Sequence, residues 1–147
     1  MDPARLVGTW RLDRFEISFS DGRPPLHPFG EDAEGMLMYG RDGHMSAVLS
    51  RAGRAPLGAS RLETSGAAPM QAKSAAFDSY LSYAGTWRME GASVVHAVHL
   101  AQTPELVGIE NRRKATLEGD TLTLSYDIRA RSQVVRHYTL VWSRAHA

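Results

Sequence analysis

The sequence predicts an all-β fold: an eight-stranded antiparallel up-and-down β-barrel with one short helix covering an end. Two observations predict it. First, β-branched and aromatic residues gather in short runs that are separated by Gly, Asp and Pro turns. Second, three connections are short enough for tight hairpins, which join antiparallel neighbours, whereas a parallel sheet needs long crossovers. A closed sheet of eight strands leaves room inside for one small ligand.

The expected strands follow one another along the chain. They span Leu6–Phe19, Gly35–Tyr39, His44–Leu49, Gly85–Met89, Ser93–Ala101, Val107–Leu117, Thr121–Asp127 and Gln133–Trp142. Tight turns are expected at Arg41-Asp42-Gly43, Glu90-Gly91-Ala92 and Glu118-Gly119-Asp120, each with a glycine that can take a positive φ. An open α+β sheet is the main alternative fold. It usually requires several helices ahead of the sheet, and only one helical segment is expected here.

That helical segment lies in mid-chain. Between Pro69 and Ala84 the apolar residues recur at helical spacing. Pro69 suits a first helical turn and Gly85 suits a terminating position, so we expect a helix that plugs or covers one end of the barrel. The preceding residues 51–68 are rich in Gly, Ala, Ser and Arg without a clear period. They predict a long loop, either a lid over a site or a disordered segment.

Composition limits the function classes. The chain has 147 residues with a net charge of +1, which suits one core and gives no strong attraction to nucleic acid or an anionic membrane. It has no cysteine, which excludes disulfides, thiolate metal sites and cysteine nucleophiles. No apolar run approaches the roughly 20 residues of a membrane helix. Met1–Arg5 leads into a strand without a signal-peptide core, so a cytoplasmic location is expected.

The first and last expected strands carry a family resemblance. Leu6-Val7-Gly8-Thr9-Trp10 is similar to the Gly-x-Trp signature of lipocalins, and Arg144 follows the last strand where those proteins carry an arginine. The resemblance implies that Trp10 seals the barrel floor and that the arginine lies against it. Because first and last strands adjoin in a closed meander, Arg144 is expected to stack on Trp10 as a cation–π pair. This feature supports the fold rather than a function.

A narrower resemblance, to the small lipocalin-like domain proteins of bacteria and fungi, covers nearly the whole chain. Its carrying segments are Leu6–Trp10, Pro28–Asp32, Gly35–Tyr39, Asp42–Ala47, Tyr80–Trp87, Val94–His96, Val107–Arg113 and Gly119–Leu124. The chain departs from that pattern at Asn111, usually glutamine, and at Lys114, usually aromatic. The resemblance implies a single lipocalin-like β-barrel domain over residues 1–147. Most such proteins look like binders, and some resemble small enzymes that isomerise or cyclise intermediates of secondary metabolism, so the fold alone does not choose.

Strand alternation predicts which polar side chains point inward. Along Val107–Leu117, the face that carries Asn111 and Arg113 is otherwise apolar, so these two residues are predicted to face the interior. A buried arginine needs an acceptor, which is either a ligand group or a protein carboxylate such as Asp127. Both interpretations are open at this point.

A histidine and several tyrosines are predicted on the same interior. His96 alternates with Val94 and Val98, and a facing arginine would lower its pKa and favour the neutral ring. His96 and His99 point to opposite faces of a strand, so no metal site is expected there. The complete set of expected ligand-binding residues is Tyr39, Tyr83, His96, Asn111, Arg113, Tyr126 and Tyr138. Core packing alone would also explain any one of the tyrosines.

The leading functional hypothesis is a protein that binds a small apolar or aromatic metabolite in the barrel. The alternative is a cofactor-independent isomerase, cyclase or dehydratase that uses the same pocket, with His96, Arg113 and Tyr39 as catalytic residues. No motif for a phosphate loop, a nucleophile elbow or a metal is present in the sequence, so no cofactor and no metal are expected. No nucleic-acid or membrane partner is expected, and a homo-oligomer is left open.

Overall fold

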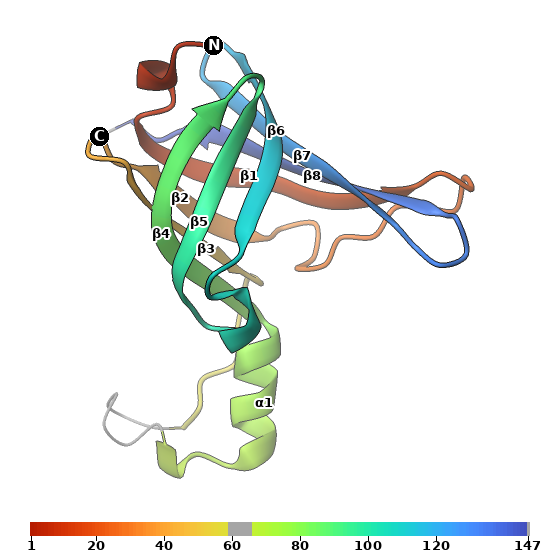
Figure 1. Cartoon of the computed structure of the whole chain (residues 1–147). Helices are drawn as coiled ribbons and strands as arrows, with labels where there is room; N and C mark the ends of the chain where they lie inside the picture. Colours follow the sequence, from red (N-terminus) through yellow and green to blue (C-terminus); the bar gives the residue numbers. More distant parts are fainter. Residues whose placement is uncertain (59–65, 147) are drawn as a thin grey trace.

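The computed structural model describes residues 1–58 and 66–146 and forms a closed antiparallel barrel (Figure 1). Its strands are β1 (Gly8–Phe19), β2 (Glu34–Tyr39), β3 (His44–Ser50), β4 (Tyr80–Glu90), β5 (Ser93–Ala101), β6 (Glu110–Glu118), β7 (Thr121–Arg129) and β8 (Val135–Arg144). Each strand pairs with the next along the chain, and β8 pairs with β1 to close the barrel. The predicted fold class is confirmed.

The tight turns lie where the sequence predicts them. Gly43, Gly91 and Gly119 have positive φ values of 84°, 60° and 58°. They allow the tight turns that connect β2 to β3, β4 to β5 and β6 to β7, respectively. The start of β6 differs from the prediction. A short 3₁₀ helix, η3 (Pro104–Leu106), and a turn at Gly108 precede it, so the strand begins at Glu110 rather than Val107.

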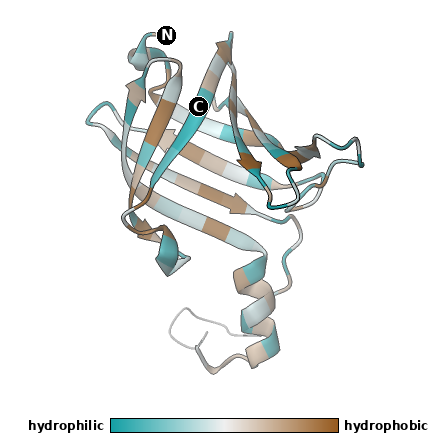
Figure 2. Ribbon diagram, turned by 45° about the vertical axis from the view of Figure 1, so that its right-hand side comes forward, coloured by the Kyte–Doolittle hydropathy of each residue, from teal (hydrophilic) through white to brown (hydrophobic). Residues whose placement is uncertain are grey.

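Alternating side chains of the strands fill the interior. On β3, for example, Met45, Ala47 and Leu49 are buried and the residues between them are half-buried. Bands of hydrophobic residues run along the strands in Figure 2. Other buried residues from β1, β2, β7 and β8 include Leu12, Leu37, Leu122, Leu124 and Trp142. The period-2 pattern of the sequence therefore sets the core, as expected for strands with one face inward.

One end of the barrel is sealed by Trp10, which is 0% exposed. Its Nε1 donates a hydrogen bond of 2.9 Å to the Leu6 carbonyl. The Arg144 guanidinium lies over the indole, 4.2 Å from the ring centroid, and also donates to the carbonyls of Val7 and Arg5. The predicted cation–π pair is confirmed. Both chain termini lie at this end (Figure 1).

The helix α1 (Met70–Asp78) lies at the other end but is shorter than predicted and differently placed. It has no buried residue and extends away from the barrel, so it does not plug the interior (Figure 1). The helical spacing predicts Tyr80, Leu81 and Ala84 in the helix, but these residues belong to β4. They pair with β3, and this cross-strand pairing overrides the local helical spacing.

Gly85 explains part of that error. It was expected to end the helix, yet it lies inside β4 at a bulge, where a Cβ would lie 1.8 Å from the Ala97 carbonyl oxygen. The glycine is needed because two backbones approach closely, not because a helix ends there. Of the predicted loop 51–68, residues 59–65 lie outside the described residues. No helix in the described part of the chain has the length and apolar character needed to cross a membrane.

Candidate ligand-binding site

The barrel interior holds a cavity of about 70 Å³, and the empty space around it, counting the part open to solvent, is about 480 Å³. The smaller volume holds roughly two water molecules. The cavity has a mainly apolar wall with a few polar groups. Its lining residues are Phe15, Leu37, Ala47, Leu49, Leu81, Tyr83, His96, Arg113, Leu124, Tyr126, Leu140 and Trp142. An apolar hollow with a few polar side chains is the usual character of a small-molecule site.

The basic run on β6 splits between the two faces of the sheet, as alternation predicts. Arg112 points outward and pairs with Glu90, while Arg113 points inward and lines the cavity. The Arg113 guanidinium lies 3.7 Å from the centroid of the Tyr126 ring. This short distance places the cation directly on the aromatic face, which fixes its position inside the barrel.

Arg113 has no carboxylate partner among the described residues. The ion pair with Asp127 is wrong, because Asp127 points outward and pairs with His137. The contact that Arg113 does make is a hydrogen bond of 3.1 Å from Nη1 to the Arg112 carbonyl. The guanidinium therefore brings a positive charge and several unused N–H donors to the cavity.

His96 lies between two tyrosines. The Tyr39 hydroxyl is 2.7 Å from Nε2, and the Tyr83 hydroxyl is 2.8 Å from Nδ1. The three side chains come from β2, β4 and β5. β4 and β5 are neighbours in the sheet, whereas Tyr39 reaches His96 from β2, which is not adjacent to either strand. His96 is 1% exposed, and these two hydrogen bonds satisfy both of its ring nitrogens within the protein.

Burial sets the protonation states of these three hydrogen-bonded side chains. Burial and the nearby Arg113 guanidinium lower the pKa of His96 to about 3, which keeps the ring neutral, as predicted. Burial also raises the pKa of Tyr83 to about 12 and raises the pKa of Tyr39 well above its ordinary value. All three side chains are therefore uncharged near neutral pH, and Arg113 supplies the positive charge of the group.

The predicted site residues fall into two sets. Tyr83, His96, Arg113 and Tyr126 line the cavity. The other three do not: Tyr39 lies behind His96, Tyr138 stacks on Tyr126 with ring centroids 4.5 Å apart, and Asn111 pairs with His96 across the β5–β6 ladder. Tyr83 falls within the predicted helical segment Pro69–Ala84, and that placement is wrong, because Tyr83 lies on β4 and lines the cavity.

Trp142 is the notable residue that sequence reasoning missed as part of the site. It is 2% exposed, lines the cavity, and its Nε1 has no hydrogen-bond partner among the described residues. Its alternation with Leu140 places it on the inward face, and that signal is readable from the sequence. That its N–H lacks a partner depends on the surrounding strands, so only the structure reveals it.

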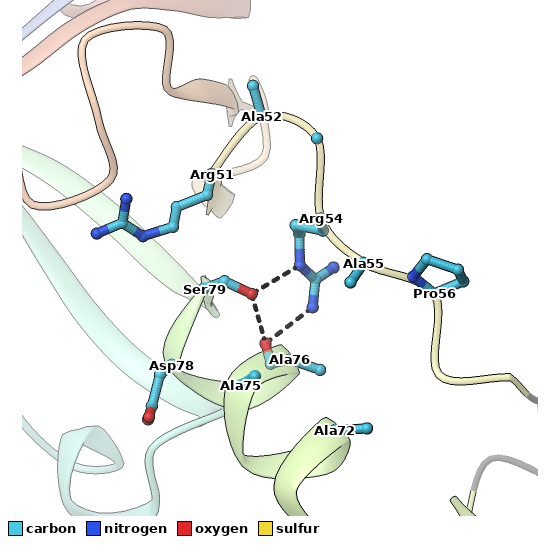
Figure 3. A pocket seen from close by; sticks show the side chains of 11 residues that line it. Arg51, Ala52, Arg54, Ala55, Pro56, Ala72, Ala75, Ala76, Asp78 and Ser79 are labelled. Atoms are coloured by element: carbon cyan, nitrogen blue, oxygen red, sulfur yellow. Dashed lines mark hydrogen bonds between the residues drawn. The ribbon is translucent and has the colours of Figure 1, made fainter.

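A larger hollow, of about 420 Å³, lies outside the barrel between α1 and residues 51–56 (Figure 3). Five of its eleven lining residues are alanines. Its central cation, Arg54, already donates to the Ser79 hydroxyl and the Ala76 carbonyl, and lies over the Tyr80 ring. Because these contacts already hold Arg54, and because this hollow lies outside the barrel, we place the candidate site in the barrel.

The described residues contain no group of three or more His, Asp or Glu side chains arranged to hold a metal ion. His96 and His99 lie on opposite faces of β5, one buried and one exposed, as predicted.

Comparison of the sequence with known proteins identifies its family. A family model described as a lipocalin-like domain matches residues 7–145, almost the whole chain. The chain belongs to the lipocalin-like domain family. The match confirms the resemblance seen in the sequence, and it agrees with the closed barrel and the sealed Trp10 end of this lipocalin-like domain. No curated protein matches the chain. A lipocalin-like barrel suggests ligand binding in general, and the particular ligand has to be inferred from the cavity.

Proposed function

We propose that this protein binds a small, largely apolar or aromatic molecule inside the barrel. The observation that carries the proposal is the cavity itself, whose apolar wall meets an inward Arg113 that has no acidic partner among the described residues. Packing for stability alone would fill such a space, because voids in a core are costly. The half-buried Arg113 also brings to it N–H donors that no described protein group uses. An empty cavity and unused donors are both explained by a ligand that fills the space and accepts the hydrogen bonds of Arg113.

Binding is tested by incubating the purified protein with a small-molecule extract of its source cells. Protein-bound and free fractions are then followed over time by chromatography and mass spectrometry. A binding protein retains one compound near one per chain and releases it unchanged. Neither retention nor consumption of any compound would refute the proposal.

A matched pair of variants locates the binding. Ala47→Met extends a side chain into the cavity, whereas Ala84→Met makes the same change on the outer face of β4. We expect the first variant to lose retention and the second to keep it. Both variants are first compared with the unmodified protein by circular dichroism, because overpacking a core costs roughly 1–3 kcal/mol.

A second candidate function is favoured by one observation, the hydrogen-bonded series Tyr39–His96–Tyr83 that ends at the cavity. In a cofactor-independent isomerase, cyclase or dehydratase, Tyr83 would exchange a proton with the substrate and Arg113 would stabilise a developing enolate. His96 would act through Tyr83, since both of its nitrogens are occupied. In the extract experiment, this activity converts a compound to a product of equal or water-shifted mass. Tyr83→Phe would then abolish turnover and leave binding largely intact.

A further inference from the structure

The polar groups that line the barrel cavity share one property: they are set to donate hydrogen bonds. The first is Arg113, whose guanidinium carries five N–H groups and has one contact to a carbonyl, that of Arg112, among the described residues. Its other N–H groups lie on the cavity side of β6, above Tyr126. Because no described protein group uses them, they are available to an acceptor on a ligand.

The second donor is the Tyr83 hydroxyl, and the hydrogen bonds of His96 assign it that role. Tyr39 is 2% exposed, and His96 Nε2 is the acceptor available to its hydroxyl among the described residues. Tyr39 must therefore donate to Nε2, which makes Nδ1 the protonated nitrogen of the neutral ring. Nδ1–H then donates to the Tyr83 oxygen. The Tyr83 hydrogen is left to point elsewhere, and Tyr83 lines the cavity.

The third donor is Nε1–H of Trp142. An indole N–H can only donate, and burying it without a partner costs free energy. Within the described part of the chain this is the buried side-chain polar atom that remains unpaired. Trp142 lines the same small cavity as Arg113 and Tyr83, and its Nε1 is itself buried, so a ligand group that meets all three donors requires a small movement of the indole.

The lining contains no group that is committed to accept. It has no Asp, Glu, Asn, Gln, Ser or Thr side chain, both nitrogens of His96 are occupied, and the Tyr126 hydroxyl can donate as well as accept. An amine would meet a positive charge, with the Tyr126 hydroxyl as its one side-chain acceptor in this lining. A phosphate dianion would bring two negative charges to a lining that holds a single cation, Arg113. A carboxylate is small, planar and singly charged, and its two oxygens match the fork of a guanidinium.

We infer that the ligand of this cavity is a small apolar carboxylic acid, bound as its carboxylate by Arg113, Tyr83 and the Trp142 N–H. The inference rests on the proposed binding function and adds its chemical class. The carboxylate lies at the donor cluster, and the apolar part of the ligand contacts the wall formed by residues such as Phe15 and Leu140. Tyr39 and His96 do not touch the ligand in this arrangement. They are positioning residues that hold Tyr83 in its donor state.

Two matched series of probes test the inference by isothermal titration calorimetry on the full chain: benzoate, benzamide and benzylamine, and hexanoate, hexanamide and hexylamine. Within each series the apolar body stays nearly constant and the head group changes. We expect the carboxylate to bind about 10- to 100-fold more tightly than the amide, as charged hydrogen bonds do, and the amine to bind most weakly. Equal affinity of acid and amide would overturn the carboxylate assignment while leaving apolar binding intact. Failure of all six probes to bind would count against both proposals.

Variants identify the donors. Arg113→Met should remove most of the preference for acid over amide, and Trp142→Phe, which keeps an aromatic ring but lacks the N–H, should reduce it about tenfold. Lys114→Met removes the same charge from the outer face of β6 and should leave the preference unchanged. An unchanged preference in both the Arg113 and Trp142 variants would overturn the inference.

A spectroscopic readout does not depend on variant stability. With ¹⁵N-labelled tryptophan, benzoate should shift the indole resonance of Trp142 strongly and that of Trp10 little, because the Trp10 N–H already donates to Leu6. A shift confined to residues outside the cavity would contradict the assignment.

Discussion

The sealed end of the barrel and the cavity contain the same kinds of residue in opposite states. At the sealed end, the Trp10 N–H donates to a carbonyl, and Arg144 both covers the indole and donates to two carbonyls. In the cavity, the Trp142 N–H has no partner among the described residues, and Arg113 covers Tyr126 with one carbonyl contact. Both tryptophans are buried, so burial alone does not separate the two regions.

The difference lies in whether the polar atoms are satisfied. A buried donor with a partner stabilises the fold modestly, whereas one without a partner costs about 1–3 kcal/mol. The sealed end is therefore a structural element, and the cavity keeps donors available at some cost in stability. The comparison teaches that a site can be recognised by what its polar groups lack as well as by which residues it contains.

The largest expected effect breaks the sealed end. Trp10→Ala removes a fully buried indole together with its hydrogen bond and the surface on which Arg144 stacks. We expect the free energy of unfolding to fall by about 3–5 kcal/mol in urea denaturation. A loss below about 1 kcal/mol would show that this end does not hold the barrel together.

The next effect is a dependence of stability on pH. It arises at the cavity, where the His96 ring titrates, and not at the sealed end, where the Trp10–Arg144 pair has no such group. The folded protein keeps His96 neutral down to a pKa of about 3, whereas the unfolded ring takes up a proton below its ordinary pKa of about 6.5. The unfolded state thus binds more protons between these values, and stability falls as pH falls. From pH 7 to pH 5, His96 alone should lower the free energy of unfolding by about 2 kcal/mol.

Urea denaturation at the two pH values measures this loss. The decrease should be about 2 kcal/mol smaller in His96→Gln, while the exposed control His99→Gln should behave like the unmodified protein. An identical decrease in all three proteins would show that His96 is not held neutral by the fold.

A pair of arginine variants sharpens the comparison directly. Arg144→Met removes the cation–π contact with Trp10 and hydrogen bonds to two carbonyls, so we expect a loss of about 1–2 kcal/mol. Arg113→Met places an apolar chain in an apolar cavity and should change stability by less than about 0.5 kcal/mol. Thermal unfolding of the two variants side by side is the test, and equal losses would remove the distinction between the regions.

The smallest effect concerns the unpaired indole. Trp142→Phe deletes a donor that has no partner, so the usual cost of a smaller core residue is offset by relief of that buried N–H. We expect a change in the free energy of unfolding of no more than about 1 kcal/mol. The same substitution at Trp10 deletes a satisfied donor and should cost more. A larger loss in the Trp142 variant than in Trp10→Phe would contradict the assignment of the two donors.

Much of the fold could be predicted from the sequence because strand alternation and glycine turns are local signals. The eight strands, the hairpins at Gly43, Gly91 and Gly119, and the stacking of Arg144 on Trp10 were all expected and are confirmed. The beginning of β4 was not. Its residues have helical spacing, and only the ladder with β3, which is distant in sequence, makes them a strand.

The site was predictable to the extent that alternation decides which way a side chain points. Arg113 and His96 face the cavity as expected for that reason. Alternation does not tell how far along the barrel a residue lies, so it does not reveal that Tyr39 and Tyr138 lie behind other side chains and outside the cavity lining. The missing partner of the Trp142 indole depends on three-dimensional neighbours, which no local pattern encodes.

The pairing of β1 with β8 has a consequence for how the chain reaches its structure. Every other strand pair joins consecutive strands, whereas this seam brings Trp10 beside Arg144 from opposite ends of the sequence. Joining such distant segments costs the most loop entropy and slows folding, so we expect the hairpins to form first and the seam to close late. Linking the two termini and opening the chain at the β6–β7 turn would convert the seam into a local connection, with the same barrel assembled in a different order of events.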